Sequence, residues 1–148
     1  MHVDFLTLAC LKDDLAQLLD ARVQGVLQTD KRSVALELYA GFRVTLLIDV
    51  NPGHARALLQ EEKARRGVEV ATPLGLLLRK YVRGGRLREV RQPPWERVLE
   101  LEIEHAEGRS VLVAEIMGRH SNLLLLDAAG VIRECVLRAG PEQNPYRV

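Results

Sequence analysis

The sequence contains little of several residue types that define common classes of protein. Only two of its 148 residues are cysteines, Cys10 and Cys135, and they form no CxxC pair. A disulfide scaffold or a zinc module is therefore disfavoured, and a reducing compartment is expected. The four histidines include no i, i+4 pair of the kind that ligates metal on a helix. We therefore expect no metal and no cofactor.

Long apolar runs are also missing. The longest covers only a handful of residues, far short of the ~20 that a membrane helix needs. The start, Met1-His2-Val3-Asp4, lacks the basic and apolar stretches of a signal peptide. These absences predict a cytoplasmic protein without a membrane segment. With 47% hydrophobic residues, the chain is apolar enough to fold as one domain over residues 1–148.

Hydrophobic periodicity predicts two helices and seven or eight strands. A helix with Asp4 as its N-cap is expected over residues 4–19, and a second helix begins at Thr72-Pro73 and ends at Gly84-Gly85. Strands are expected over 22–28, 34–38, 42–48, 87–92, 98–105, 111–116, 123–127 and 131–136, with turns at 29–31, 40–41 and 127–130. Residues 51–67 are expected to be loop with some short ordered element. The pattern predicts an α+β fold, a β-sandwich of mostly antiparallel strands flanked by two helices.

The net charge of +1 conceals an uneven distribution. Seventeen of the 21 basic residues are arginines. A basic stretch over residues 79–91 contains Arg79, Lys80, Arg83, Arg86, Arg88 and Arg91 against the single acid Glu89, and an acidic stretch over 96–107 follows it. Because arginine pairs with phosphate and stacks on bases, the basic stretch is a candidate nucleic-acid surface. The alternative is arginine enrichment on a solvated face, caused by base composition or heat adaptation.

One polar segment, Glu115-Ile116-Met117-Gly118-Arg119-His120-Ser121-Asn122, lies between two apolar strands. Arg119 and His120 could line an anion or nucleotide site on the turn, with Ser121 or Asn122 bonding nearby backbone groups. The alternative is a hydrogen-bonded bulge that serves only as scaffold. The sequence has no nucleophile elbow, phosphate-binding glycine loop or Cys/His signature. We therefore do not expect an enzyme, nor a small-molecule substrate.

Segment 115–122 carries the hallmark of the NFACT family, whose members include fibronectin-binding-like proteins, and the chain resembles that family in further blocks. The similar blocks, in family order, include residues 51–56 (NPGHAR), 72–81 (TPLGLLLRKY) and 144–147 (NPYR). The resemblance covers only the family's N-terminal domain. Family members continue into helical, coiled-coil and RNA-binding regions, so we expect this chain to be an excised or natural fragment.

The resemblance implies a fold like the N-terminal domain of formamidopyrimidine-DNA glycosylases, which is a β-sandwich flanked by helices. Those glycosylases use an N-terminal proline amine as nucleophile. No proline follows Met1 here, which opposes a glycosylase activity.

The function implied by the resemblance is ribosome-associated quality control. The partners would be the obstructed large ribosomal subunit and a tRNA, alanyl in bacteria, in support of mRNA-independent tailing of the stalled chain. The family's Asp-Arg pair falls at Glu96-Arg97, where glutamate replaces aspartate; these two residues would recognise tRNA nucleotides, unless they form an ordinary surface ion pair. The basic stretch 79–91 would contact phosphates. An alternative function is that of a surface adhesin, which the missing signal peptide opposes.

Overall fold

The computed structural model describes residues 5–51, 55–61, 72–93, 97–116 and 121–136. Within these ranges the chain forms two helices and nine strands, and the predicted α+β class is confirmed. The elements are α1 (Phe5–Ala16), β1 (Arg22–Asp30), β2 (Ser33–Tyr39), β3 (Arg43–Asp49), β4 (Arg56–Gln60), α2 (Pro73–Tyr81), β5 (Arg86–Arg91), β6 (Val98–His105), β7 (Gly108–Glu115), β8 (Asn122–Asp127) and β9 (Ile132–Cys135). Neither helix is long and apolar enough to cross a membrane.

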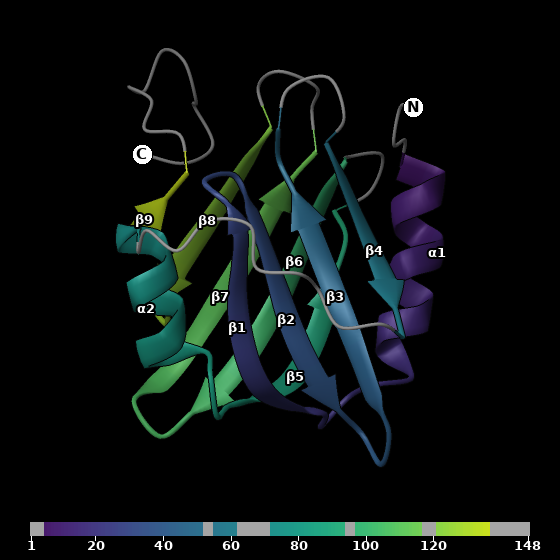
Figure 1. Cartoon of the computed structure of the whole chain (residues 1–148), viewed down its shortest axis with the longest axis horizontal. Helices are drawn as coiled ribbons and strands as arrows, with labels where there is room; N and C mark the ends of the chain where they lie inside the picture. The colour runs from purple at the N-terminus through teal and green to yellow at the C-terminus, as the bar shows by residue number, and fades with distance from the viewer. Residues whose placement is uncertain (1–4, 52–54, 62–71, 94–96, 117–120, 137–148) are drawn as a thin grey trace.

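All nine strands belong to one antiparallel sheet in the order β4-β3-β2-β1-β5-β6-β7-β8-β9. The junction between β1 and β5 is narrow, with Arg22 opposite Arg86 as its one register pair. At this junction the sheet bends, so that β1–β4 lie in front of β5–β8 (Figure 1). A single bent sheet therefore produces the layered arrangement that the sequence predicted as a sandwich. The likeness to the glycosylase domain stays a prediction.

The space between the two halves of the sheet holds the main core. Leu36 and Ile48 from the first half, and Leu99, Leu112 and Leu125 from the second, are at most 1% exposed and belong to the same cluster. Each such leucine or isoleucine contributes about 1.5–3 kcal/mol through burial. On β6 the glutamates 100, 102 and 104 alternate with buried apolar residues and lie on the outer face, which confirms the period-two prediction.

The helices close opposite sides of the bent sheet (Figure 1). Helix α1 packs Leu11 and Leu15 into the core, and Leu18 of the following turn joins them; the helix contacts β4, β5 and β6. Helix α2 packs against β1, β7 and β9. As predicted, Thr72 caps α2, because its Oγ1 accepts a hydrogen bond from the Gly75 amide at 3.1 Å.

Several bounds differ from the predictions; α1, for example, ends at Ala16 rather than at residue 19. The segment expected to be loop with some short ordered element contains β4, whose five residues give little periodic signal but whose backbone pairs with β3. Strand β1 continues to Asp30, since the carboxylate of Asp30 accepts from the Arg32 amide at 2.7 Å and moves the turn to residues 31–32. Strand β7 begins at Gly108, which takes the positive φ of 112° that closes a tight hairpin with β6.

Candidate nucleic-acid interface

The described residues predicted to bind nucleic acid lie at both ends of the sheet, along β5 and on α2. At one end of β6, Val98 pairs with Glu115, and at the other end His105 pairs with Gly108. Eight residues of strand span about 25 Å. The start of β6, the end of β7 and the start of β8 lie at the upper end in Figure 1, whereas the end of α2 and the start of β5 lie at the lower end. Arg97 directly precedes β6, while Arg83 and Arg86 lie between α2 and the start of β5. The structure thus does not gather the predicted residues into one surface.

At the upper end, segment 115–122 joins two neighbouring strands, as predicted. Glu115 ends β7 and is paired in register with Asn122, which begins β8. Glu115, Ser121 and Asn122 are buried. Asn122 Oδ1 accepts a hydrogen bond from the Leu123 amide at 2.9 Å, which confirms the predicted bond to nearby backbone. Arg119 and His120 lie outside the described residues.

Arg97 stands beside this segment, one residue before β6. Its carbonyl accepts a hydrogen bond from the Ile116 amide at 2.9 Å, so its backbone is bonded to the start of segment 115–122. Its side chain is exposed. Glu96, the other member of the predicted pair, lies outside the described residues. The arrangement fixes the backbone of Arg97 and leaves its guanidinium accessible.

Between the two ends, the basic and acidic stretches of the sequence face each other on β5 and β6. Arg88 Nε donates to Glu104 at 2.8 Å, and its Nη1 also pairs with Asp20. Arg91 donates to Glu100 at 3.2 Å and lies 2.9 Å from Glu89. The antiparallel register places these opposite charges on adjacent strands. These two arginines of the predicted basic surface are therefore compensated by carboxylates.

The ion pairs shift the pKa values of Arg88, Arg91 and Glu104. Hydrogen bonds from Arg88 to Glu104 and then Asp20 raise the pKa of Arg88, and the same bond from Arg88 lowers the pKa of Glu104. Burial works to lower the pKa of Arg91. The hydrogen bond to Glu100 and the nearby carboxylates outweigh that burial, so the pKa of Arg91 is raised.

The C-terminal end of α2 carries two further members of the basic stretch. Arg79 is half-buried, and Lys80 is exposed, with its Nζ 5.1 Å from the centre of the Tyr81 ring. Arg133 of β9 stacks on the same ring at 3.9 Å. Both cations are within the range of cation–π attraction, so Tyr81 links α2 to β9.

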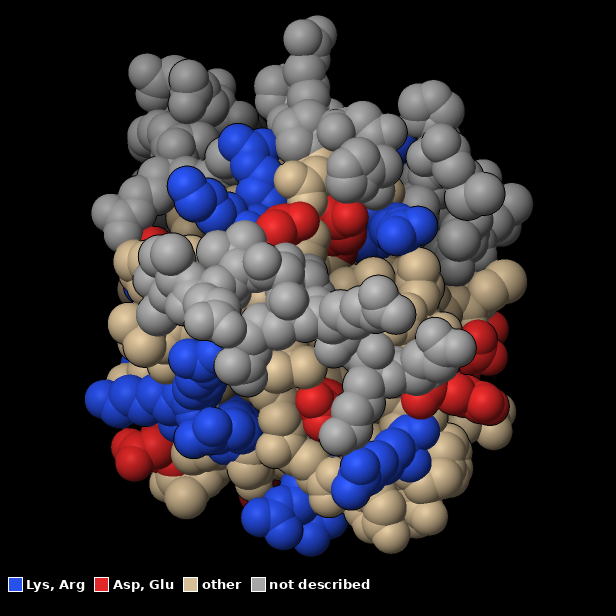
Figure 2. Space-filling view, viewed as in Figure 1, with Lys and Arg blue, Asp and Glu red and all other residues tan. Residues whose placement is uncertain are grey.

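At the lower end, Arg83 lines a groove of about 580 Å³ together with two arginines that the sequence did not mark. These are Arg22, the first residue of β1, and Arg43, the first residue of β3; Glu37 of β2 also lines the groove. Clusters of basic side chains surround the lower half of the face seen in Figure 2. The sequence could have indicated this groove only through the pairing of β2 with β1 and β3, which places both Arg22 and Arg43 opposite Tyr39.

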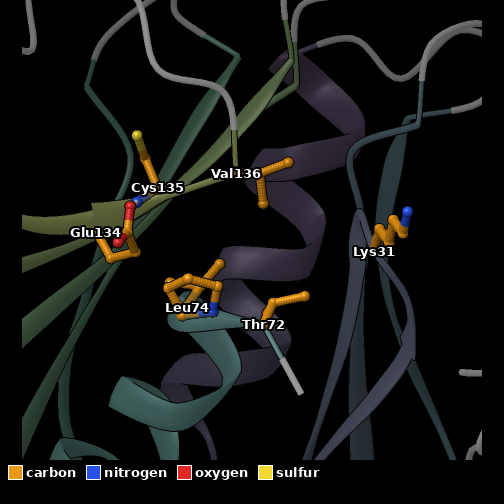
Figure 3. A pocket seen from close by; sticks show the side chains of 7 residues that line it. Lys31, Thr72, Leu74, Glu134, Cys135 and Val136 are labelled. Atoms are coloured by element: carbon orange, nitrogen blue, oxygen red, sulfur yellow. Dashed lines mark hydrogen bonds between the residues drawn. The ribbon is translucent and has the colours of Figure 1, made fainter. Parts of the chain in front are cut away.

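A smaller cavity of about 320 Å³ lies between the start of α2, β9 and the turn after β1 (Figure 3). Leu74 and Val136 form much of its wall, and Cys135 and Lys31 stand on opposite sides of it (Figure 3). The hydroxyl of Thr72 is engaged at both its donor and acceptor positions, with Gln28 and the Gly75 amide. In the described part of the chain, no three His, Cys, Asp or Glu side chains gather as metal ligands.

The bent nine-stranded sheet with its two helices places the protein in the α+β class. Residues 4–148 match the model of the NFACT N-terminal and middle domains, and the chain belongs to that family.

The curated proteins to which the chain is similar include proteins named Rqc2 homolog RqcH. It is 27% identical to that of Streptococcus pneumoniae serotype 2 over 139 residues, covering 89% of this chain and 25% of the relative. It is 29% identical to that of Bacillus subtilis over 141 residues, covering 88% and 24%. The chain thus spans about a quarter of the length of the curated relatives it matches.

Two solved structures share the fold at similar identity. The N-terminal domain of fibronectin-binding protein PavA from Streptococcus pneumoniae gives a TM-score of 0.84 at 27% identity, covering 98% of this chain and 57% of that one. The N-terminal part of the fibronectin/fibrinogen-binding protein from Streptococcus suis gives 0.86 at 27% identity, with the same coverage.

Proposed function

We propose that the chain is an RNA-binding module of a cytoplasmic ribosome-associated quality-control factor. It would bind obstructed large ribosomal subunits and a tRNA, alanyl in bacteria, and support mRNA-independent tailing of the stalled chain. The bond would be made by the ribosome, so the module itself is not an enzyme. Membership of the NFACT family and the similarity to proteins named Rqc2 homolog RqcH support this function.

The observation that carries the proposal is the position of Arg97. Its backbone is held by the Ile116 amide at 2.9 Å, and its side chain is exposed at the end of the sheet where segment 115–122 also lies. Among the described residues, no ion pair engages its guanidinium. A planar guanidinium held in this way can stack on, or pair with, an unstacked nucleotide of RNA. Glu96 would accept from base amino or imino groups beside it.

Binding of this chain to fluorescein-labelled tRNA and to purified large ribosomal subunits tests the proposal. Arg97→Ala should weaken tRNA binding, and Arg109→Ala, which removes an exposed arginine from the opposite end of the sheet, should not. The double variant Glu96→Ala/Arg97→Ala should lose tRNA binding with an unchanged melting temperature. If the chain binds neither RNA nor subunits, or if the two single variants behave alike, this function is wrong.

A second candidate function is binding to fibronectin. It is favoured by the two solved neighbours, whose names describe fibronectin-binding proteins. Pull-down on immobilised fibronectin, with ribosomal RNA as competitor, separates the two functions. Saturable fibronectin binding that RNA does not displace would favour the adhesin, and retention of ribosomal RNA alone would favour the quality-control module.

A further inference from the structure

The groove at the lower end of the sheet, called here the arginine groove, is lined by Arg22, Arg43 and Arg83. The three side chains come from the start of β1, the start of β3 and the turn after α2, which are far apart in the sequence. All three are exposed. One acid, Glu37, lines the groove with them. The groove therefore carries a net positive charge.

The charges of these three arginines are not compensated by ion pairs in the described part of the chain. This distinguishes them from Arg88 and Arg91, each of which contacts two or more carboxylates. Glu37 is half-buried, and its carboxyl carbon lies 3.4 Å from the position that a Cβ would take at Gly25, so this acid lies against β1. Like charges gathered in a groove repel one another, and an anion between them removes that repulsion.

The backbone beneath the groove is held by a dense set of hydrogen bonds. The Gly84 amide donates to the Val23 carbonyl at 2.7 Å, and the Val23 amide donates to the Gly85 carbonyl at 2.8 Å. His105 Nε2 donates to the Arg83 carbonyl at 2.9 Å, and its Nδ1 accepts from the Glu107 amide. These bonds fix Arg83 next to the start of β1. The groove is thus built before any ligand arrives, which lowers the entropic cost of binding.

We propose that the arginine groove binds consecutive phosphates of an RNA strand. This inference rests on the proposed function, because it adds a second RNA contact at the end of the sheet opposite Arg97. Arg22 and Arg43 lie on the two strands that flank β2, and with Arg83 they line an open groove of about 580 Å³. A phosphodiester backbone, which presents regularly spaced charges, suits this lining better than a compact single anion. An acidic peptide is the competing occupant.

The test compares two variants that lose the same charge. The groove variant is Arg22→Ala/Arg43→Ala/Arg83→Ala. The control variant, Arg88→Ala/Arg91→Ala/Arg109→Ala, removes three arginines that each contact a carboxylate. Anisotropy of fluorescein-labelled tRNA is measured between low and moderate salt, with circular dichroism to check that each variant is folded.

The groove variant should bind about 100-fold more weakly at low salt. The slope of log affinity against log salt should become shallower by about two to three units, because each lost phosphate contact removes about 0.7–0.9. The control variant should keep its slope within about one unit of the parent chain. Equal losses in the two variants would overturn the proposal, as would displacement of RNA by polyglutamate at equal charge concentration. If the parent chain binds no RNA at all, the proposed function fails as well, which is a different result from a groove variant that binds normally.

Discussion

The arginines of the arginine groove and those of β5 have the same side chain, but their surroundings differ. Arg88 and Arg91 face a strand that carries a glutamate at every second position, and the register brings these charges together. Arg22, Arg43 and Arg83 converge from three separate elements on a surface with one acid. The comparison teaches that neighbouring members of one basic run can have different surroundings, since Arg88 and Arg91 are paired with carboxylates whereas Arg83 joins two arginines from distant parts of the sequence.

The same comparison separates scaffold from binding surface. An exposed ion pair between strands supports the sheet only weakly, because water screens it. An uncompensated guanidinium contributes nothing of this kind to the fold, yet it attracts phosphate at long range. Changes at the ion-paired arginines should therefore affect mainly the stability of the sheet. Changes at the groove arginines should affect mainly RNA binding.

The largest effect is expected from Gly85→Ala, which displaces the backbone beneath the groove. A Cβ at Gly85 would lie 2.7 Å from Ile103 Cγ2 and 2.8 Å from the Glu104 carbonyl oxygen, so the turn after α2 must move. Overpacking of this kind costs about 1–3 kcal/mol of unfolding free energy, and RNA binding should weaken with it. Gly25→Ala, whose Cβ would meet Glu37 at an ordinary 3.4 Å, is the control. Urea denaturation that finds both variants equally stable would contradict the described packing.

A smaller effect is expected from Gln24→Glu, which adds a carboxylate to the groove and so makes its arginines resemble Arg88 and Arg91. Gln24 lines the groove and is exposed. A carboxylate there could pair with a groove arginine and should weaken tRNA binding about fivefold at low salt, on the scale of about 1 kcal/mol for one exposed charge. Gln17→Glu on the turn after α1 adds the same charge elsewhere. An equal loss with Gln17→Glu would show that only net charge matters.

Removing the carboxylates that contact a β5 arginine should make that arginine behave like those of the groove. Asp20→Asn/Glu104→Gln removes both carboxylates that contact Arg88 and leaves that arginine uncompensated. RNA binding should then strengthen about two- to threefold, and the salt slope should steepen by up to about one unit. The control, Asp13→Asn/Asp14→Asn, removes two exposed acids from α1. The expectation fails if the control strengthens binding as much.

The smallest effect concerns stability and pH. The hydrogen bond from Arg88 lowers the pKa of Glu104. A carboxyl with a lowered pKa in the folded state contributes stability above its unfolded value, about 4.3, and loses it as pH falls through the folded value. Arg88→Ala should therefore lower the melting temperature slightly at pH 7, and the difference should shrink as the pH falls below the unfolded value. A difference that stays constant as the carboxyl groups become protonated would show that Arg88 acts through packing instead.

Periodicity was sufficient to predict most of the fold. The alternation on β6 and the Thr72 cap of α2 are local features, so the sequence alone predicts them. Strand β4 has no comparable local signal, because it is an edge strand defined by its pairing with β3. The bend between β1 and β5 likewise depends on long-range pairing and cannot be read from either strand.

The candidate site was less predictable than the fold. The position of segment 115–122 between two strands and the backbone bond of Asn122 were predictable, since both follow from local polar residues in an apolar context. The compensation of Arg88 depends on cross-strand register and on Asp20, which lies far away in the sequence. The convergence of Arg22 and Arg43 with Arg83 depends on the same kind of long-range information.

The most direct test of the account is to observe the arginine side chains while RNA is added. In NMR spectra of the Nε–Hε groups of the labelled chain, titration with tRNA should shift the signals of Arg22, Arg43 and Arg83 in a saturable manner. The signals of Arg88 and Arg91, which already contact carboxylates, should stay in place. Shifts confined to Arg88 and Arg91, or equal shifts in both groups, would contradict the claim that Arg22, Arg43 and Arg83, rather than the carboxylate-paired arginines of β5, form the RNA-binding surface.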